Sequence, residues 1–291
     1  EFAQRMKNEE MITLAKFLAI SGIILPMLPH KNLIPDINLT PYSIWLATVV
    51  VSGISYLSYL LKRYVFHESG TLVSGIIGGL YSSTATISVL ARKSRKASEQ
   101  EATDYVAAML LAVSMMFLRF MILILIFSRE IFLSIYPYLL TMAVVAAIVA
   151  WFIHSRQKRP EGQSAETEED DSSNPLEFKV ALIFAILFVI FTFLTHYTLV
   201  YAGTGGLNLL SFVSGFSDIT PFILNLLQNT GSVAALIITA CSMQAIISNI
   251  MVNMFYALFF AGKGSKLRPW ILGGFGVVIV CNLVLLLFFY I

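Results

Sequence analysis

The sequence predicts an all-α polytopic membrane protein with about seven transmembrane helices and two re-entrant helical hairpins in an inverted-topology repeat. Three observations lead to this fold class: long apolar runs, the placement of lysine and arginine between them, and a short internal repeat. Of the 291 residues, 57% are hydrophobic and 12% are charged, and the mean hydropathy is +0.80. This composition is too apolar for a soluble domain, and an open sheet would leave its backbone groups unpaired in lipid.

Nine apolar segments follow one another, and most approach the roughly 20 residues that a helix needs to cross a bilayer. Bounded by charge, Pro or Gly, they are Met11–Leu28, Ser43–Leu61, Thr71–Leu90, Tyr105–Phe127, Ile131–Ile153, Leu176–Val200, Leu207–Leu227, Ser232–Ala261 and Trp270–Ile291.

One hydrophilic stretch divides the chain into two halves. It begins at Ser155 with basic residues, continues with acidic ones, and is typical of a disordered loop. We therefore expect an N-terminal helix and outer loop (residues 1–42), a first repeat (43–154), a disordered cytoplasmic linker (155–175) and a second, inverted repeat (176–291).

Lysine and arginine near segment ends indicate which ends face the cytoplasm. Only one apolar segment separates Lys62 and Arg63 from the cluster Arg92–Lys96, so a simple crossing would place one of these clusters outside. If residues 71–91 instead enter and leave on the cytoplasmic side, and residues 207–228 do the same from the outer side, all basic clusters fall inside. The clusters are Arg5/Lys7/Lys16, Lys62/Arg63, Arg92–Lys96, Arg156/Lys158/Arg159 and Lys263/Lys266/Arg268. The alternative, in which every segment spans, violates the rule at one cluster or at several.

The two re-entrant candidates also resemble each other in sequence. Sliding the second half onto the first aligns GGLYSSTAT with SGFSDITPF. The aligned pairs are Gly70 with Gly206, Gly79 with Gly215, Ser82 with Asp218 and Thr84 with Thr220. Each half then has an odd number of crossings, so the halves run in opposite senses through the membrane.

The first re-entrant segment combines glycines with hydroxyl side chains. Gly75, Gly78 and Gly79 allow a tight turn and close backbone approach. Hydroxyls follow at the start of the returning half-helix, whose N-terminus favours anions. They belong to Ser82, Ser83, Thr84 and Thr86. The alternative is that small residues only let helices pack closely.

The second segment carries Asp218, with Thr220 beside it and Pro221 in the first turn of the following helix. Asp218 is predicted either to cap that helix or to act as a proton carrier or cation ligand, since a carboxylate near mid-bilayer costs roughly 2.5–3.5 kcal/mol.

Arg119 is the one Arg or Lys well inside an apolar crossing. It is expected either to pair with Asp218 or to bind an anion in a cavity. Asn249 and Asn253 lie one helical turn apart on the counterpart crossing, and they either bond between helices or line the same cavity.

Other classes of protein are disfavoured. The net charge of +2 gives no sign of a nucleic-acid partner, and His and Cys show no metal-ligand spacing. We expect no cofactor and no enzyme activity, because a nucleophile at Ser82 or Ser83 lacks a well-placed intramembrane base.

The segment GIIGGLYSSTATISVLARKSR, with VSGISYLSYLLKR before it and SMMFLRFMILI after it, resembles a known family. This family is a multi-pass bacterial membrane domain of unknown function that often follows an MgtC/SapB-like domain. The resemblance extends from FLAISGIILPMLP through GFSDITPFILNL, and the family pattern has Arg and Asp where Arg119 and Asp218 stand. No MgtC-like domain precedes Arg5, as expected of a stand-alone version or a piece of a longer protein. The resemblance implies a bacterial inner membrane and a link to ion homeostasis.

Two functions are therefore expected. The first is transport of a small, anionic solute or ion through a midplane site between the two hairpins, driven by proton coupling through Asp218. The second is a non-transporting regulatory or scaffold protein. In both cases the chain sits in the inner (plasma) membrane with its N-terminus in the cytoplasm, and it is compatible with a homo-oligomer.

Overall fold

The fold is helical throughout the part of the chain that the structure describes. The computed structural model describes residues 8–35, 37–65, 70–95, 97, 99–156, 178–228, 233–262 and 265–290. Its elements are α2 (Asn8–Met27), α3 (Pro41–Leu60), the π-helical turn η1 (Leu61–Val65), α4 (Thr71–Lys93), α5 (Glu99–Phe127), α6 (Arg129–Ser155), α7 (Phe178–Ser214), α8 (Ile219–Gln228), α9 (Ala235–Ala261) and α10 (Arg268–Tyr290). The predicted linker lies mainly outside the described residues.

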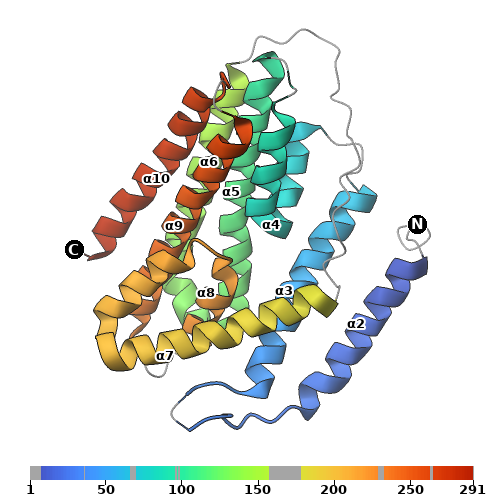
Figure 1. The fold of residues 1–291 in the computed structure, drawn as a ribbon, viewed down its shortest axis with the longest axis vertical. Helices are drawn as coiled ribbons and strands as arrows, with labels where there is room; N and C mark the ends of the chain where they lie inside the picture. The colour runs from blue at the N-terminus through green and yellow to red at the C-terminus, as the bar shows by residue number, and fades with distance from the viewer. Residues whose placement is uncertain are drawn as a thin grey trace.

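Seven of the described helices are long and apolar enough to cross a membrane when only total length and composition are counted: α3, α4, α5, α6, α7, α9 and α10. The prediction of an all-α polytopic membrane protein is thus confirmed. The helices α5 and α9 are the most deeply buried of these, with 56% and 67% of their apolar windows inside the molecule. Figure 1 shows α6 and α10 beside them in the upper part of the molecule, while α7 runs across the lower part.

The helix α4 folds back on itself at Ser82. The backbone there is extended (φ −158°, ψ 107°), and the Ser82 Oγ accepts a hydrogen bond from the Ala85 N–H at 3.3 Å, as an N-cap does. A Cβ placed on Gly78 would lie only 2.5 Å from the Thr86 Oγ1. Residues eight apart in an unbroken helix are about 12 Å apart, so the two legs, residues 71–81 and 83–93, run antiparallel.

The first leg of this hairpin packs on α5 through glycine. A Cβ on Gly75 would lie 2.3 Å from the Ala108 carbonyl oxygen, and one on Gly79 would lie 2.5 Å from the Ala112 Cα. Gly75 and Gly79 therefore allow the first leg to pack closely on α5, whereas the chain reverses direction at Ser82.

The second half repeats this arrangement. The helix α7 bends at Gly203, whose φ of +59° favours glycine, and its last part then turns into α8 through residues 215–218. A Cβ on Gly215 would lie 2.4 Å from the Ser248 Cβ. The contact Gly79–Ala112 and the contact Gly215–Ser248 are related by the same shift of 136 residues that aligns the two sequences.

The two hairpins open toward opposite ends of the bundle. After the first hairpin, the Arg95 guanidinium donates from Nη2 to the Phe259 carbonyl at 3.2 Å, at the C-terminal end of α9. At the end of the second hairpin, the Gln228 carbonyl accepts from the Asn38 Nδ2 at 2.6 Å, just before α3 begins. Since α9 begins near the end of α8, these two contacts lie at opposite ends of α9.

Candidate functional site

The side chain of Arg119 joins the two helix breaks. It projects from α5, and its Nη1 donates to the Tyr81 carbonyl at 2.8 Å while its Nη2 donates to the Thr220 Oγ1 at 2.7 Å. Tyr81 is the last residue of the first leg of α4, and Thr220 lies in the first turn of α8. We call Tyr81, Ser82, Arg119, Asp218 and Thr220 the Arg119 site.

Each break leaves a helix N-terminus at this site. Ser82 caps the returning leg of α4, and the extended backbone at Ser82 frees the Tyr81 carbonyl for Arg119. In the second half, the Asp218 Oδ1 accepts from the Thr220 N–H at 2.9 Å, and Pro221 occupies the first turn of α8. Ser82 and Asp218, which the internal repeat aligns, therefore occupy equivalent capping positions.

The site lies at half the height of the long helices. Ala112 is at the middle of α5 and Ser248 is at the middle of α9, and these are the residues that the two hairpins touch. Arg119 lies two turns beyond Ala112, but a helical side chain points back toward its N-terminus, which brings the guanidinium to the level of the breaks. Each leg of α4 is about 16 Å long, roughly half of a hydrocarbon layer of about 30 Å.

The electrostatics of the site favour an anion. The N-termini of the returning leg of α4 and of α8 each carry a partial positive charge, and Arg119 adds a full one. Asp218 supplies one negative charge, which interacts with the guanidinium charge and offsets part of the cost of its burial. Arg119 as a whole residue is half-buried, and Asp218 is exposed.

The remaining residues of the first predicted cluster lie next to the Arg119 site, in the returning leg of α4. Ser83 is buried, Thr84 is half-buried, and Thr86 packs across the hairpin against Gly78. They form the wall of the hairpin, and the described hydrogen bonds of Arg119 do not include them.

Asn249 and Asn253 hold the second hairpin from α9. The Asn249 Nδ2 donates to the Gly215 carbonyl at 3.2 Å, and the Asn253 Nδ2 donates to the Asn249 Oδ1 at 3.1 Å. Both side chains are buried, with exposed fractions of 4% and 0%. Asn249 thus bonds between elements of the second half, one of the two alternatives that the sequence left open, whereas the bond of Asn253 stays within α9.

The bond to the Tyr81 carbonyl was not predicted from the sequence, and Ser248 stood out only as one of several polar residues on its crossing, without a partner assigned to it. The Tyr81 carbonyl is a backbone group, so no residue type marks it. The Ser248 hydroxyl donates to the Phe212 carbonyl at 2.7 Å and so satisfies the end of α7. Its signal was available, because Ser248 occupies the position in the second half that Ala112 occupies in the first.

A basic cluster stands at the end of the bundle where the first hairpin opens. Besides the bond from Arg95 to Phe259, the Arg95 Nε donates to the Phe260 carbonyl, and the Arg92 guanidinium lies 4.3 Å from the centre of the Phe260 ring. These contacts bind the end of α4, in the first half, to the end of α9, in the second. Arg156 lies at the end of α6, two residues after His154. The His154 Nδ1 lies 2.6 Å from the Asp104 Oδ1.

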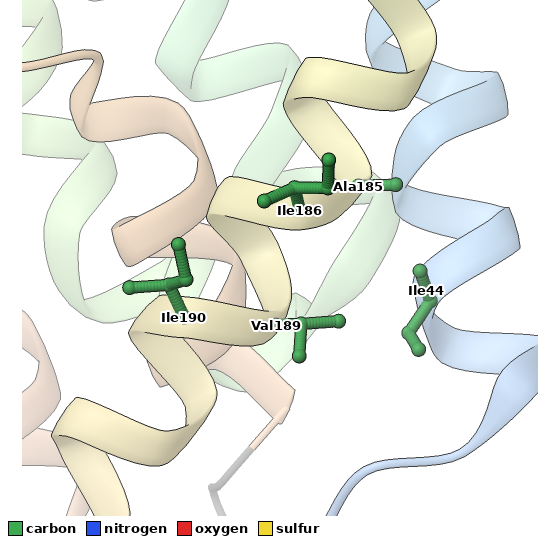
Figure 2. A pocket seen from close by; sticks show the side chains of 5 residues that line it. All are labelled: Ile44, Ala185, Ile186, Val189 and Ile190. Atoms are coloured by element: carbon green, nitrogen blue, oxygen red, sulfur yellow. The ribbon is translucent and has the colours of Figure 1, made fainter.

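A groove of about 270 Å³ lies elsewhere, between α3 and α7. Figure 2 shows its lining, which consists of the apolar side chains Ile44, Ala185, Ile186, Val189 and Ile190. Such a surface suits lipid chains and offers no group that would bind a polar solute. Within the described residues, no three His, Cys, Asp or Glu side chains gather closely enough to hold a metal ion.

Comparison with known proteins identifies a family. The family model described as "Domain of unknown function (DUF4010)" matches residues 49–261. An uncharacterized protein of Aquifex aeolicus (strain VF5) is 25% identical over 227 residues, which are 76% of this chain and 96% of that protein. No solved structure matches.

Proposed function

We propose a transport function for this member of the DUF4010 family, to which the chain belongs: it carries a small anionic solute or ion across the membrane through the Arg119 site. The observation that carries the proposal is that one arginine at mid-height joins both helix breaks. Interrupted helices whose N-termini meet near the midplane are the usual place of substrate binding in transporters built from inverted repeats.

The guanidinium has capacity left for a ligand. Arginine has five N–H donors, and the described hydrogen bonds of Arg119 use two of them. A small anion that bridges the remaining donors and the two helix N-termini gains charge-assisted hydrogen bonds.

In the proposed membrane setting both hairpins are re-entrant. The first enters from the cytoplasm, where the basic clusters lie, and the second enters from the outer side. The setting is a bacterial inner membrane with the N-terminus of the chain in the cytoplasm. The proposal includes no enzymatic step.

Asp218 is the proposed route of proton coupling. It is the one acidic side chain of the Arg119 site, it is exposed, and a carboxylate at this depth changes its charge when it takes up a proton. Asp218→Asn keeps an amide oxygen that caps α8, so the fold is retained.

The test is uptake into proteoliposomes. We expect Arg119→Gln to reduce anion uptake at least tenfold and Arg119→Lys to reduce it less, since lysine keeps the charge but not the planar fork. Asp218→Asn should abolish uptake driven by a pH gradient. Arg129→Gln, the same change at an exposed position at the start of α6, is the control and should transport like the wild type. Equal uptake by Arg119→Gln and wild type would refute the site, and undiminished pH-driven uptake by Asp218→Asn would refute the coupling.

A second candidate is a non-transporting regulatory or scaffold protein linked to ion homeostasis. The close glycine packing of both hairpins on α5 and α9 favours it, because such contacts suit a fixed structure. A thermal-shift screen of the purified protein against anions, cations and pH separates the two candidates, since a ligand that binds the folded state raises its apparent stability. A scaffold would show no shift with any small anion and no flux.

A further inference from the structure

The charges of Arg119 and Asp218 are held side by side by one residue. Thr220 accepts a hydrogen bond from Arg119 at its Oγ1 and donates its N–H to the Asp218 Oδ1, at 2.7 Å and 2.9 Å. In the described part of the chain the two charges act on each other without a hydrogen bond between them. A cation and an anion therefore interact at this point, and Thr220 bonds to both of them.

Both groups keep hydrogen-bonding capacity of opposite kinds. Arg119 retains three N–H donors beyond its two described bonds. Asp218 is exposed, and its described bond uses Oδ1, which leaves Oδ2 as an acceptor. An ionised carboxylate accepts hydrogen bonds and donates none, so an acceptor placed against Oδ2 is repelled.

We infer that the Arg119 site selects oxyanions that carry a hydroxyl hydrogen of their own. This inference rests on the proposed function and names the substrate class of the same site. The deprotonated oxygens of the anion accept from Arg119, and its O–H group donates to the Asp218 Oδ2. An anion without a hydroxyl hydrogen can accept hydrogen bonds from Arg119, but it places an acceptor oxygen against the Asp218 Oδ2, which repels it.

Two matched pairs of probes test this inference. Bicarbonate and nitrate are both planar, singly charged and similar in size, but only bicarbonate has an O–H group. Dihydrogen phosphate and dimethyl phosphate share one negative charge and two acceptor oxygens, but only the first has O–H groups. Binding to the purified wild-type protein is measured by calorimetry, with Arg119→Gln as the blank.

We expect at least tenfold tighter binding of the hydroxyl-bearing member in one or both pairs. Asp218→Asn places an N–H donor where Oδ2 was and keeps the cap, so it should remove or reverse that preference. Equal binding of both members by the wild type would overturn this inference and leave the anion site standing. Binding of none of the four probes would overturn both the inference and the proposed function.

Discussion

Thr220 makes hydrogen bonds to both charged residues of the Arg119 site. Its hydroxyl is the side-chain partner of Arg119, its amide is the partner of Asp218, and its side chain is buried with 1% exposed. Removing a hydrogen-bond acceptor from a charged donor leaves that donor unpaired, which costs about 1–3 kcal/mol.

Thr220→Val is therefore expected to lower the melting temperature and weaken anion binding, while Thr220→Ser, which keeps the hydroxyl, preserves both. Valine has the shape of threonine, so the loss is of the acceptor alone. Thermal unfolding in detergent, with and without anion, measures both effects.

Thr239→Val is the matched control. Its hydroxyl is buried and has no hydrogen-bond partner among the described residues, so the same replacement is expected to leave stability unchanged or raise it. Equal destabilisation by Thr220→Val and Thr239→Val would contradict the role given to Thr220.

The sequence alone was enough to select individual site residues where a residue type is energetically costly inside the membrane. Arg119 and Asp218 stand out because charge inside an apolar segment is expensive. Whether the two pair directly was not predictable, since that depends on Thr220 and on a backbone carbonyl at Tyr81. For Asn249 and Asn253 the shared face followed from their spacing, but their partner, the Gly215 carbonyl, required the fold.

At the scale of elements, each hairpin has a glycine that faces the middle of a long helix, Gly79 in the first and Gly215 in the second. A methyl group on Gly79 or Gly215 would meet backbone or Cβ atoms at 2.4–2.6 Å, where no flexible side chain can move aside. Gly79→Ala and Gly215→Ala are each expected to destabilise the protein by about 1–3 kcal/mol through overpacking. Chemical or thermal unfolding of the purified variants measures the loss.

Gly273→Ala in α10 is the control for these variants, because no atom of the described residues lies within 4 Å of a Cβ placed there. Alanine in a helix is more favourable than glycine, so this variant should be unchanged or more stable by about 0.5–1 kcal/mol. A similar loss in all three variants would contradict the role given to the close approach at Gly79 and Gly215.

Charge placement and the internal repeat pointed to the two segments that break, and the structure places its breaks inside them. The residue that turns was harder to assign. Glycine is the usual residue at a tight turn, yet Gly75 and Gly79 face α5 and the chain reverses at Ser82, where a hydroxyl caps the next leg. The bend of α7 at Gly203 lay in the predicted gap between two apolar segments.

At the scale of the whole molecule, the direction of each hairpin determines which loops share a side of the membrane. In a background without Cys241 and Cys281, we expect Arg63→Cys and Arg92→Cys to react with a membrane-impermeant thiol reagent from the same side. Asn38→Cys and Tyr201→Cys should react from the other side. All four positions are exposed. Labelling of intact and permeabilised cells measures the sides, and opposite sides for Arg63→Cys and Arg92→Cys would mean that α4 crosses the membrane.

The arrangement of the halves followed from the sequence more readily than their contacts. A shift of 136 residues relates α5 to α9 as well as the two hairpins, so four short sequence matches were enough to predict the repeat. The bond between Arg95 and the end of α9 joins positions 164 residues apart, and a local sequence pattern cannot predict a contact over such a separation.

The mid-height position of the Arg119 site also has a consequence for membrane voltage. A hairpin leg of about 16 Å covers about half of the hydrocarbon layer, so a single charge moving between the site and either surface crosses about half of the electric field. That step is worth about 1.2 kcal/mol per 100 mV. In the proposed transport, a resting potential that is negative inside would therefore oppose the entry of a bare anion over both halves of its path, and a proton moving with the anion would cancel this electrical work.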